Sequence, residues 1–87
     1  MLNIKIIIED AIINIQDQHS YKKVELKGDV TLTRDLGFSS LDVAQLIAYL
    51  EIELGVDPFS QGVSIAEINT LEGLLKVYEN AFKEEMI

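Results

Sequence analysis

Two adjacent serines in the middle of the chain are the residues best suited to chemistry. They lie in the run Asp35-Leu36-Gly37-Phe38-Ser39-Ser40-Leu41-Asp42, after a turn and before an amphipathic helical pattern. At the first turn of a helix, free backbone N–H groups and the helix dipole favour an anion. A phosphodiester on Ser40 would suit that position, although many helices begin with an unmodified serine. Ser40 is therefore a candidate attachment site for a phosphorylated group.

The rest of the chain offers no comparable set of reactive residues. His19 is the only histidine and there is no cysteine, which excludes disulfides and thiolate metal sites. Glu51 and Glu53 fall on different faces of a helix, and no glycine-rich phosphate loop, zinc-ligand spacing or nucleophile elbow is present. We therefore predict no catalytic residue and no metal site. His19 is interpreted as a solvated residue in a loop or at a helix end.

The helix that follows the serines has the clearest pattern. Ser39 is a good N-cap, and Asp42 three residues later completes a shortened capping box. Gly55 predicts the end of the helix, and Pro58 prevents its continuation. The predicted buried face repeats at three- and four-residue steps and comprises Val43, Leu46, Ile47, Leu50 and Leu54. The predicted opposite face comprises Asp42, Gln45, Ala48, Tyr49 and Ile52.

The segments on either side complete a small helical protein. Residues 2–18 have apolar residues at helical spacing, although their many β-branched side chains also allow a strand. A long connection covers residues 19–38, and its apolar residues are expected to anchor it to the core: Val24, Leu26, Val30, Leu32 and Leu36. A short helix or turn is predicted over Gly62–Ile68, and a final helix runs to about Lys83 after a cap at Asn69 or Thr70.

Composition and charge limit the possible partners. The 87 residues predict one domain, residues 1–87, and the net charge is −8. The segment between Arg34 and Lys76 contains no basic residue and seven acidic ones, a pattern that disfavours nucleic acid and favours partners with basic patches. The acidic residues also have a simpler interpretation, as solubilising surface. No stretch is long and apolar enough for a membrane span, and we expect a cytoplasmic monomer.

Taken together, these segments resemble the acyl carrier proteins. The similarity rests on Asp35-Leu36-Gly37 before the serines, Leu41-Asp42 after them, the run Leu46–Val56, and Ile65–Leu75, and it extends from about Leu32 to Phe82. In that family a D-L-G-x-D-S-L segment carries a serine modified by 4′-phosphopantetheine. The resemblance implies an all-α bundle of three main helices plus a short helix, with a long loop between the first two.

The resemblance also implies a role for each part of the site. Ser40 would carry the arm, attached by a phosphopantetheinyl transferase, and the thiol of the arm would hold acyl groups as thioesters. The protein would be a carrier and not an enzyme, serving acyl-loading and acyl-transferring enzymes with basic docking patches. The residues expected to dock those partners are Asp35, Leu41, Asp42, Ala44, Gln45, Ala48, Glu51 and Ile52.

Some residues depart from the family pattern. The family commonly has aspartate at the position of Ser39, and Gln45 and Ile52 replace glutamates that are common in carriers of fatty acid biosynthesis. These departures favour a specialised lipid or secondary-metabolite pathway. Phe38 stands where peptidyl carriers commonly have glycine, so acyl cargo is preferred over aminoacyl or peptidyl cargo. The alternative from another class is an unmodified interaction protein with the carrier fold.

Overall fold

Three α-helices and two short 3₁₀ helices make up the computed structural model, which describes residues 3–19 and 25–85. In chain order they are α1 (Ile4–His19), α2 (Ser40–Leu54), η1 (Pro58–Gln61), η2 (Ile65–Ile68) and α3 (Leu71–Glu85). The predicted all-α bundle of three main helices, with a long connection between the first two, is confirmed. The difference is that two short helices, and not one, separate α2 from α3.

The N-terminal segment is a helix because its apolar residues fit one face of a helix against the core. Ile8, Ile12 and Ile15 recur at three- and four-residue steps and are all buried. Asn3 begins the helix, since its side-chain oxygen accepts a hydrogen bond from the Ile6 N–H at 3.1 Å. The strand that the β-branched composition also allowed does not form, because burial of this face outweighs the local propensity.

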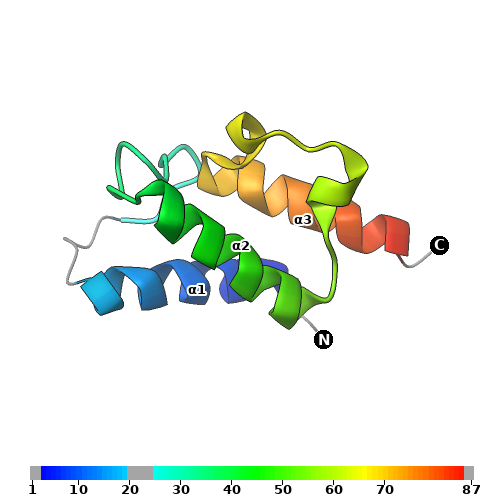
Figure 1. The fold of residues 1–87 in the computed structure, drawn as a ribbon, viewed down its shortest axis with the longest axis horizontal. Helices are drawn as coiled ribbons and strands as arrows, with labels where there is room; N and C mark the ends of the chain where they lie inside the picture. Colours follow the sequence, from blue (N-terminus) through cyan, green and yellow to red (C-terminus); the bar gives the residue numbers. More distant parts are fainter. Residues whose placement is uncertain (1–2, 20–24, 86–87) are drawn as a thin grey trace.

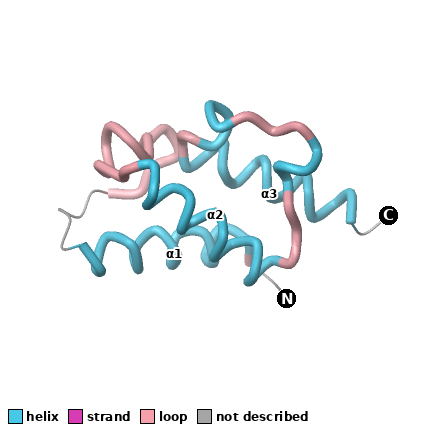
Figure 2. Tube along the Cα trace, viewed as in Figure 1, coloured by secondary structure: helices cyan, strands magenta, loops and turns pink. Residues whose placement is uncertain are grey.

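The helices form two packed groups (Figures 1 and 2). α2 packs mainly against α1, whereas η1 and η2 pack against α3, and α1 also contacts α3. The buried side chains form one core that is shared by the two groups. On α3 the inward residues are Leu71, Leu74, Tyr78 and Ala81. The two groups are therefore joined by the contact between α1 and α3 and by the core that they share.

The connection between α1 and α2 is fastened to the beginning of α3. The Leu71 N–H donates to the Val30 carbonyl at 3.1 Å, and the Leu32 N–H donates to the Asn69 carbonyl at 2.9 Å. Val30 and Leu32 are buried, as predicted, while Val24 lies outside the described residues. These backbone hydrogen bonds, together with an isolated antiparallel bridge between Thr31 and Thr70, hold residues 25–39 of the connection against the beginning of α3.

A glycine inside α3 allows η2 to lie close to that helix. A Cβ atom on Gly73 would collide with the backbone carbonyl of Glu67 in η2. Thr70 is the N-cap of α3, because its hydroxyl accepts a hydrogen bond from the Gly73 N–H at 3.0 Å. The close contact and the cap fix the position of η2, and with it Ile68, which is buried.

Within residues 3–19 and 25–85, no helix has both the length and the apolar character that a membrane crossing requires.

Candidate functional site

The turn before the serines is anchored to the core by the residues on both sides of Gly37. Gly37 has a positive φ of 73°, a conformation that other residues rarely adopt. Leu36 and Phe38 on either side of it are buried, and the Phe38 N–H donates to the Leu32 carbonyl at 2.9 Å. The chain therefore leaves the core at a fixed point, and Ser39 and Ser40 come directly after it.

A reciprocal pair of hydrogen bonds begins α2 at Ser39. The Ser39 hydroxyl accepts from the Asp42 N–H at 3.1 Å, and the Asp42 carboxylate accepts from the Ser39 N–H at 2.9 Å. The predicted capping box is confirmed. Ser40 is the first residue of α2 and is exposed, so its hydroxyl can be reached from solvent.

The placement of Asp42 on the exposed face of α2 was wrong. Asp42 is only 2% exposed, and its Oδ1 lies 3.0 Å from Nε2 of His19, the last residue of α1. Asp42 begins the four-residue series that continues with Leu46, Leu50 and Leu54, so its side chain points toward α1. A carboxylate in this position cannot serve as a docking contact. It joins the beginning of α2 to the end of α1.

His19 has a structural contact that its sequence position did not reveal. It lies at a helix end, as predicted, and its side chain is 42% exposed, but its ring faces the buried Asp42 carboxylate. The Asp42 carboxylate also lies in the first turn of α2, where the helix dipole favours a negative charge. The site of Ser40 is therefore coupled to α1 through Asp42.

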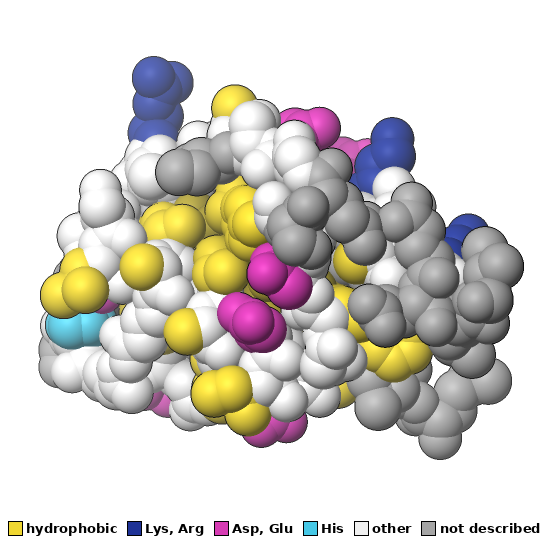
Figure 3. Space-filling view, turned by 45° about the vertical axis from the view of Figure 1, so that its right-hand side comes forward, with side chains coloured by type: hydrophobic (Ala, Val, Ile, Leu, Met, Phe, Trp, Pro, Cys, Tyr) yellow, Lys and Arg dark blue, Asp and Glu magenta, His cyan; other side chains and the backbone are white. Residues whose placement is uncertain are grey.

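A groove opens beside Ser40 along one side of α2. Its volume is about 420 Å³, within the range of roughly 300–1,000 Å³ that is common for small-molecule sites. Figure 3 shows hydrophobic side chains gathered in a hollow, with acidic side chains beside it. The lining residues come from α2, η1 and η2: Ser40, Val43, Ala44, Ile47, Ala48, Glu51, Phe59 and Ile68. The groove is thus apolar, except for Ser40 and Glu51.

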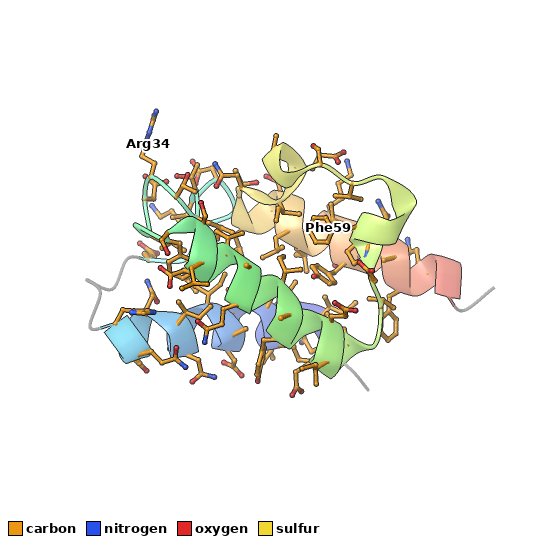
Figure 4. The ribbon with its side chains drawn as sticks, viewed as in Figure 1. Arg34 and Phe59 are labelled. Atoms are coloured by element: carbon orange, nitrogen blue, oxygen red, sulfur yellow. The ribbon has the colours of Figure 1, made fainter. Side chains whose placement is uncertain are left out.

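The groove lies where the two packed groups of helices meet. Figure 4 shows Phe59 between α2 and α3, whereas Arg34 projects from the loop into solvent. Phe59 follows Pro58 in η1, a helix that the sequence analysis did not predict. Asp57 caps η1 by accepting a hydrogen bond from the Phe59 N–H at 3.0 Å. This local structure fixes one wall of the groove.

A polar group is buried in the core near Glu51. Tyr78 of α3 is fully buried, and its hydroxyl has no hydrogen-bond partner among the described residues. Burial raises the pKa of this phenol well above its usual value, and the carboxylates of Glu51 and Asp57 raise it further. Tyr78 therefore remains a neutral phenol over the physiological pH range.

The other predicted docking residues occupy different parts of the surface. Leu41 and Ile52 are 77% and 80% exposed, and the remaining ones on α2 are also exposed: Ala44, Gln45, Ala48 and Glu51. Asp35 is exposed too, but it lies in the loop before α2, where its carboxylate accepts a hydrogen bond from the Thr31 N–H at 2.8 Å. Asp35 thus closes a turn and is separate from the exposed face of α2.

Sequence reasoning found only one side of the groove: Ser40, Ala44, Ala48 and Glu51 were predicted as attachment or docking residues, whereas the apolar lining was not predicted. Val43 and Ile47 were predicted as core positions, but they are only half-buried and line the groove together with Phe59. Their positions at the edge of the apolar face of α2 were a signal that they could border a cavity. The opposite wall depends on η1 and η2, and so on contacts distant in the sequence.

No protein-family model, curated protein or solved structure significantly matches the chain. No group of three or more residues suited to hold a metal ion occurs within the described segments.

Proposed function

We propose that this protein is a carrier of the acyl carrier type, with a 4′-phosphopantetheine arm attached to Ser40. The observation that carries the proposal is that an exposed serine at the first position of α2 borders an apolar groove of about 420 Å³. A phosphodiester on Ser40 would lie at the positive end of the helix dipole. The arm would begin where the groove begins, so an attached acyl chain could enter the groove.

The chemistry of the arm divides the work between the carrier and its enzymes. In the attachment step the Ser40 hydroxyl forms a phosphodiester with the phosphopantetheine part of coenzyme A, and the adenosine bisphosphate part leaves. The thiol of the arm then holds the cargo as a thioester, which partner enzymes load and transfer. Apolar walls suit an acyl chain better than a peptidyl group, whose buried amides would need hydrogen-bond partners.

The proposed partners are a phosphopantetheinyl transferase and acyl-loading or acyl-transferring enzymes. We place these reactions in the cytoplasm, in a specialised lipid or secondary-metabolite pathway, and we expect the carrier to act as a monomer. Basic groups on such enzymes would meet the carboxylates that are exposed beside the groove, among them Glu51.

Intact-mass spectrometry tests the attachment directly. The full chain is incubated with coenzyme A, magnesium and a broad-specificity phosphopantetheinyl transferase, and it should gain one arm. Ser40→Ala should abolish the gain. Ser39→Ala should retain it, although loss of the cap costs about 1 kcal/mol of stability. Attachment to Ser39, or no attachment with several transferases, would contradict the proposal.

Protein isolated from its own host distinguishes the alternatives. An acylated arm supports the proposed cargo, whereas an aminoacyl or peptidyl arm would reassign it. A chain without any arm would indicate an unmodified interaction protein.

A further inference from the structure

The outward face of α2 carries a row of apolar side chains, here called the crest. The crest consists of Leu41, Ala44, Ala48 and Ile52, which follow one another at three- and four-residue steps and are all exposed. Leu41 and Ile52 at its ends are the two most exposed large hydrophobic residues described. At 1.5 Å per residue the row is about 16 Å long. An apolar row of this kind beside a proposed attachment site is a candidate contact surface.

The crest has no exposed charge along its first three turns. α2 contains only three charged residues, and one of them, Asp42, is buried against His19. The other two, Glu51 and Glu53, lie in the last turn of the helix. The exposed acidic residues between Arg34 and Lys76 therefore lie in the segments on either side of α2 and at its C-terminal end. A basic patch over the middle of the crest would have no carboxylate to pair with.

The flank of the crest that faces α1 carries neutral hydrogen-bonding groups. A second hollow of about 280 Å³ lies between α1 and α2 and is lined by Ala11, Asn14, Ile15, Gln18, Gln45 and Tyr49. The Gln45 side-chain amide donates to the Gln18 side-chain oxygen at 3.1 Å across this hollow. These amides and the Tyr49 hydroxyl can pair with neutral polar groups of a partner.

We infer that the crest docks on an enzyme surface that is apolar at its centre and neutral but hydrogen-bonding at the flank facing α1. Basic groups of that enzyme are confined to the end near Glu51 and Glu53. This inference rests on the proposed carrier function and specifies the partner that it requires. Four small or medium side chains form a contact much smaller than a permanent dimer needs, so the crest suits a transient enzyme complex.

Site-specific photo-crosslinking in the host identifies the partner. A photoreactive phenylalanine analogue replaces Ala44 in the full chain, and mass spectrometry identifies both the captured protein and the residues joined. We expect an acyl-handling enzyme joined through an apolar or neutral surface. Capture through a surface rich in lysine and arginine, or no enzyme captured, would overturn the inference.

The purified enzyme then allows a quantitative comparison. We expect Leu41→Glu, at the end of the crest far from Glu51 and Glu53, to lower kcat/KM for the acylated carrier by about tenfold, as loss of an apolar contact does. Ile6→Glu is the matched control, since Ile6 is a 52% exposed isoleucine on α1, and it should change kcat/KM by less than about twofold. Equal effects of the two changes would overturn the inference.

Salt separates an apolar contact from a basic one. Between 50 and 400 mM salt, kcat/KM should change by less than about threefold, because the centre of the contact contains no ion pair to screen. A much steeper fall, removed by changing Glu51 and Glu53 to glutamine, would show that a basic patch dominates instead. Intact mass of the same samples tests the arm separately, so failure of attachment at Ser40 is distinguishable from failure of the crest.

Discussion

The two long sides of α2 are built differently. Toward α1, polar contacts cross the boundary, between His19 and Asp42 at 3.0 Å and between Gln18 and Gln45 at 3.1 Å. Toward η1 and η2, the boundary is an apolar groove of about 420 Å³. Hydrogen bonds require particular distances and angles, whereas apolar contacts do not. The difference suggests that α2 is fixed to α1 and that the groove side is the side able to adjust.

Of the changes considered, removal of the Asp42 carboxylate at the boundary between α1 and α2 should lower the stability most. Asp42→Ala removes an acceptor from the capping box and the partner of His19, and we expect it to lower the free energy of unfolding by about 2 kcal/mol. Urea unfolding followed by circular dichroism measures this change.

Two further variants isolate the contribution of the contact with His19. Asp42→Asn keeps a side-chain acceptor for the Ser39 N–H and should cost about half as much. In a double-mutant cycle, Asp42→Ala and His19→Gln should be coupled, since the two side chains are in contact. Additive effects would mean that Asp42 acts only as a cap and does not fasten α1.

Occupation of the groove should stabilise the adjustable side. With the proposed arm on Ser40, an octanoyl group that buries two methylenes should gain about 1.5 kcal/mol, which raises Tm by roughly 6–12 °C for a domain of this size. An acetyl group should give almost no rise. Ile47→Phe fills the groove and should remove the difference in Tm between the octanoyl and acetyl forms. Ile13→Phe, at an exposed position of α1, should retain that difference. A difference that survives Ile47→Phe would show that the chain lies elsewhere.

Replacement of the buried Tyr78 phenol should increase stability. Tyr78→Phe removes a hydroxyl that has no partner among the described residues, and we expect the free energy of unfolding at pH 7 to rise by about 1 kcal/mol. Tyr49→Phe, on the surface, should change little. Lower stability of Tyr78→Phe at pH 7 would show that the hydroxyl is hydrogen-bonded in solution.

The same substitution predicts a difference at alkaline pH. The pKa of Tyr78 is raised in the folded protein, so above about pH 10 the unfolded chain releases a proton that the folded chain keeps. The wild type should therefore lose stability as the pH rises above 10. The advantage of Tyr78→Phe should grow over that window, measured by urea unfolding at pH 7, 9.5 and 10.5.

The smallest effect is expected from the second contact with α1. Gln45→Ala breaks an exposed side-chain hydrogen bond and should lower stability by less than about 0.5 kcal/mol. The coupling between Gln45→Ala and Gln18→Ala should be equally small. A coupling above about 1 kcal/mol would place this contact on a level with the Asp42 cap.

Local signals predicted most of the α2 region. Ser39, Asp42 and Gly55 gave both ends of the helix, because caps depend on a few neighbouring residues. The inward direction of Asp42 could also have been predicted, since the residue is four positions before Leu46. Its charge favoured an exposed position, and the partner that makes burial acceptable, His19, is 23 positions away.

The groove could not be predicted from the same signals. Its far wall is formed by η1 and η2, whose position depends on contacts with α3 that are distant in the sequence. Pro58 was interpreted only as the end of α2, although Asp57 followed by proline is also a signal for the start of a helix. Half-buried residues such as Ile47 lie at the edge of the apolar face, but the sequence does not show whether another element covers that edge or leaves it open.

The contact between Gly73 and Glu67 influences the width of the groove from a position outside it. Any side chain at Gly73 would require η2 to move, and η2 carries Ile68, one of the groove walls. Gly73 itself does not line the groove. Under the proposed carrier function, a change in a single codon could therefore fit the groove to cargo of another size, although its residue never touches the cargo.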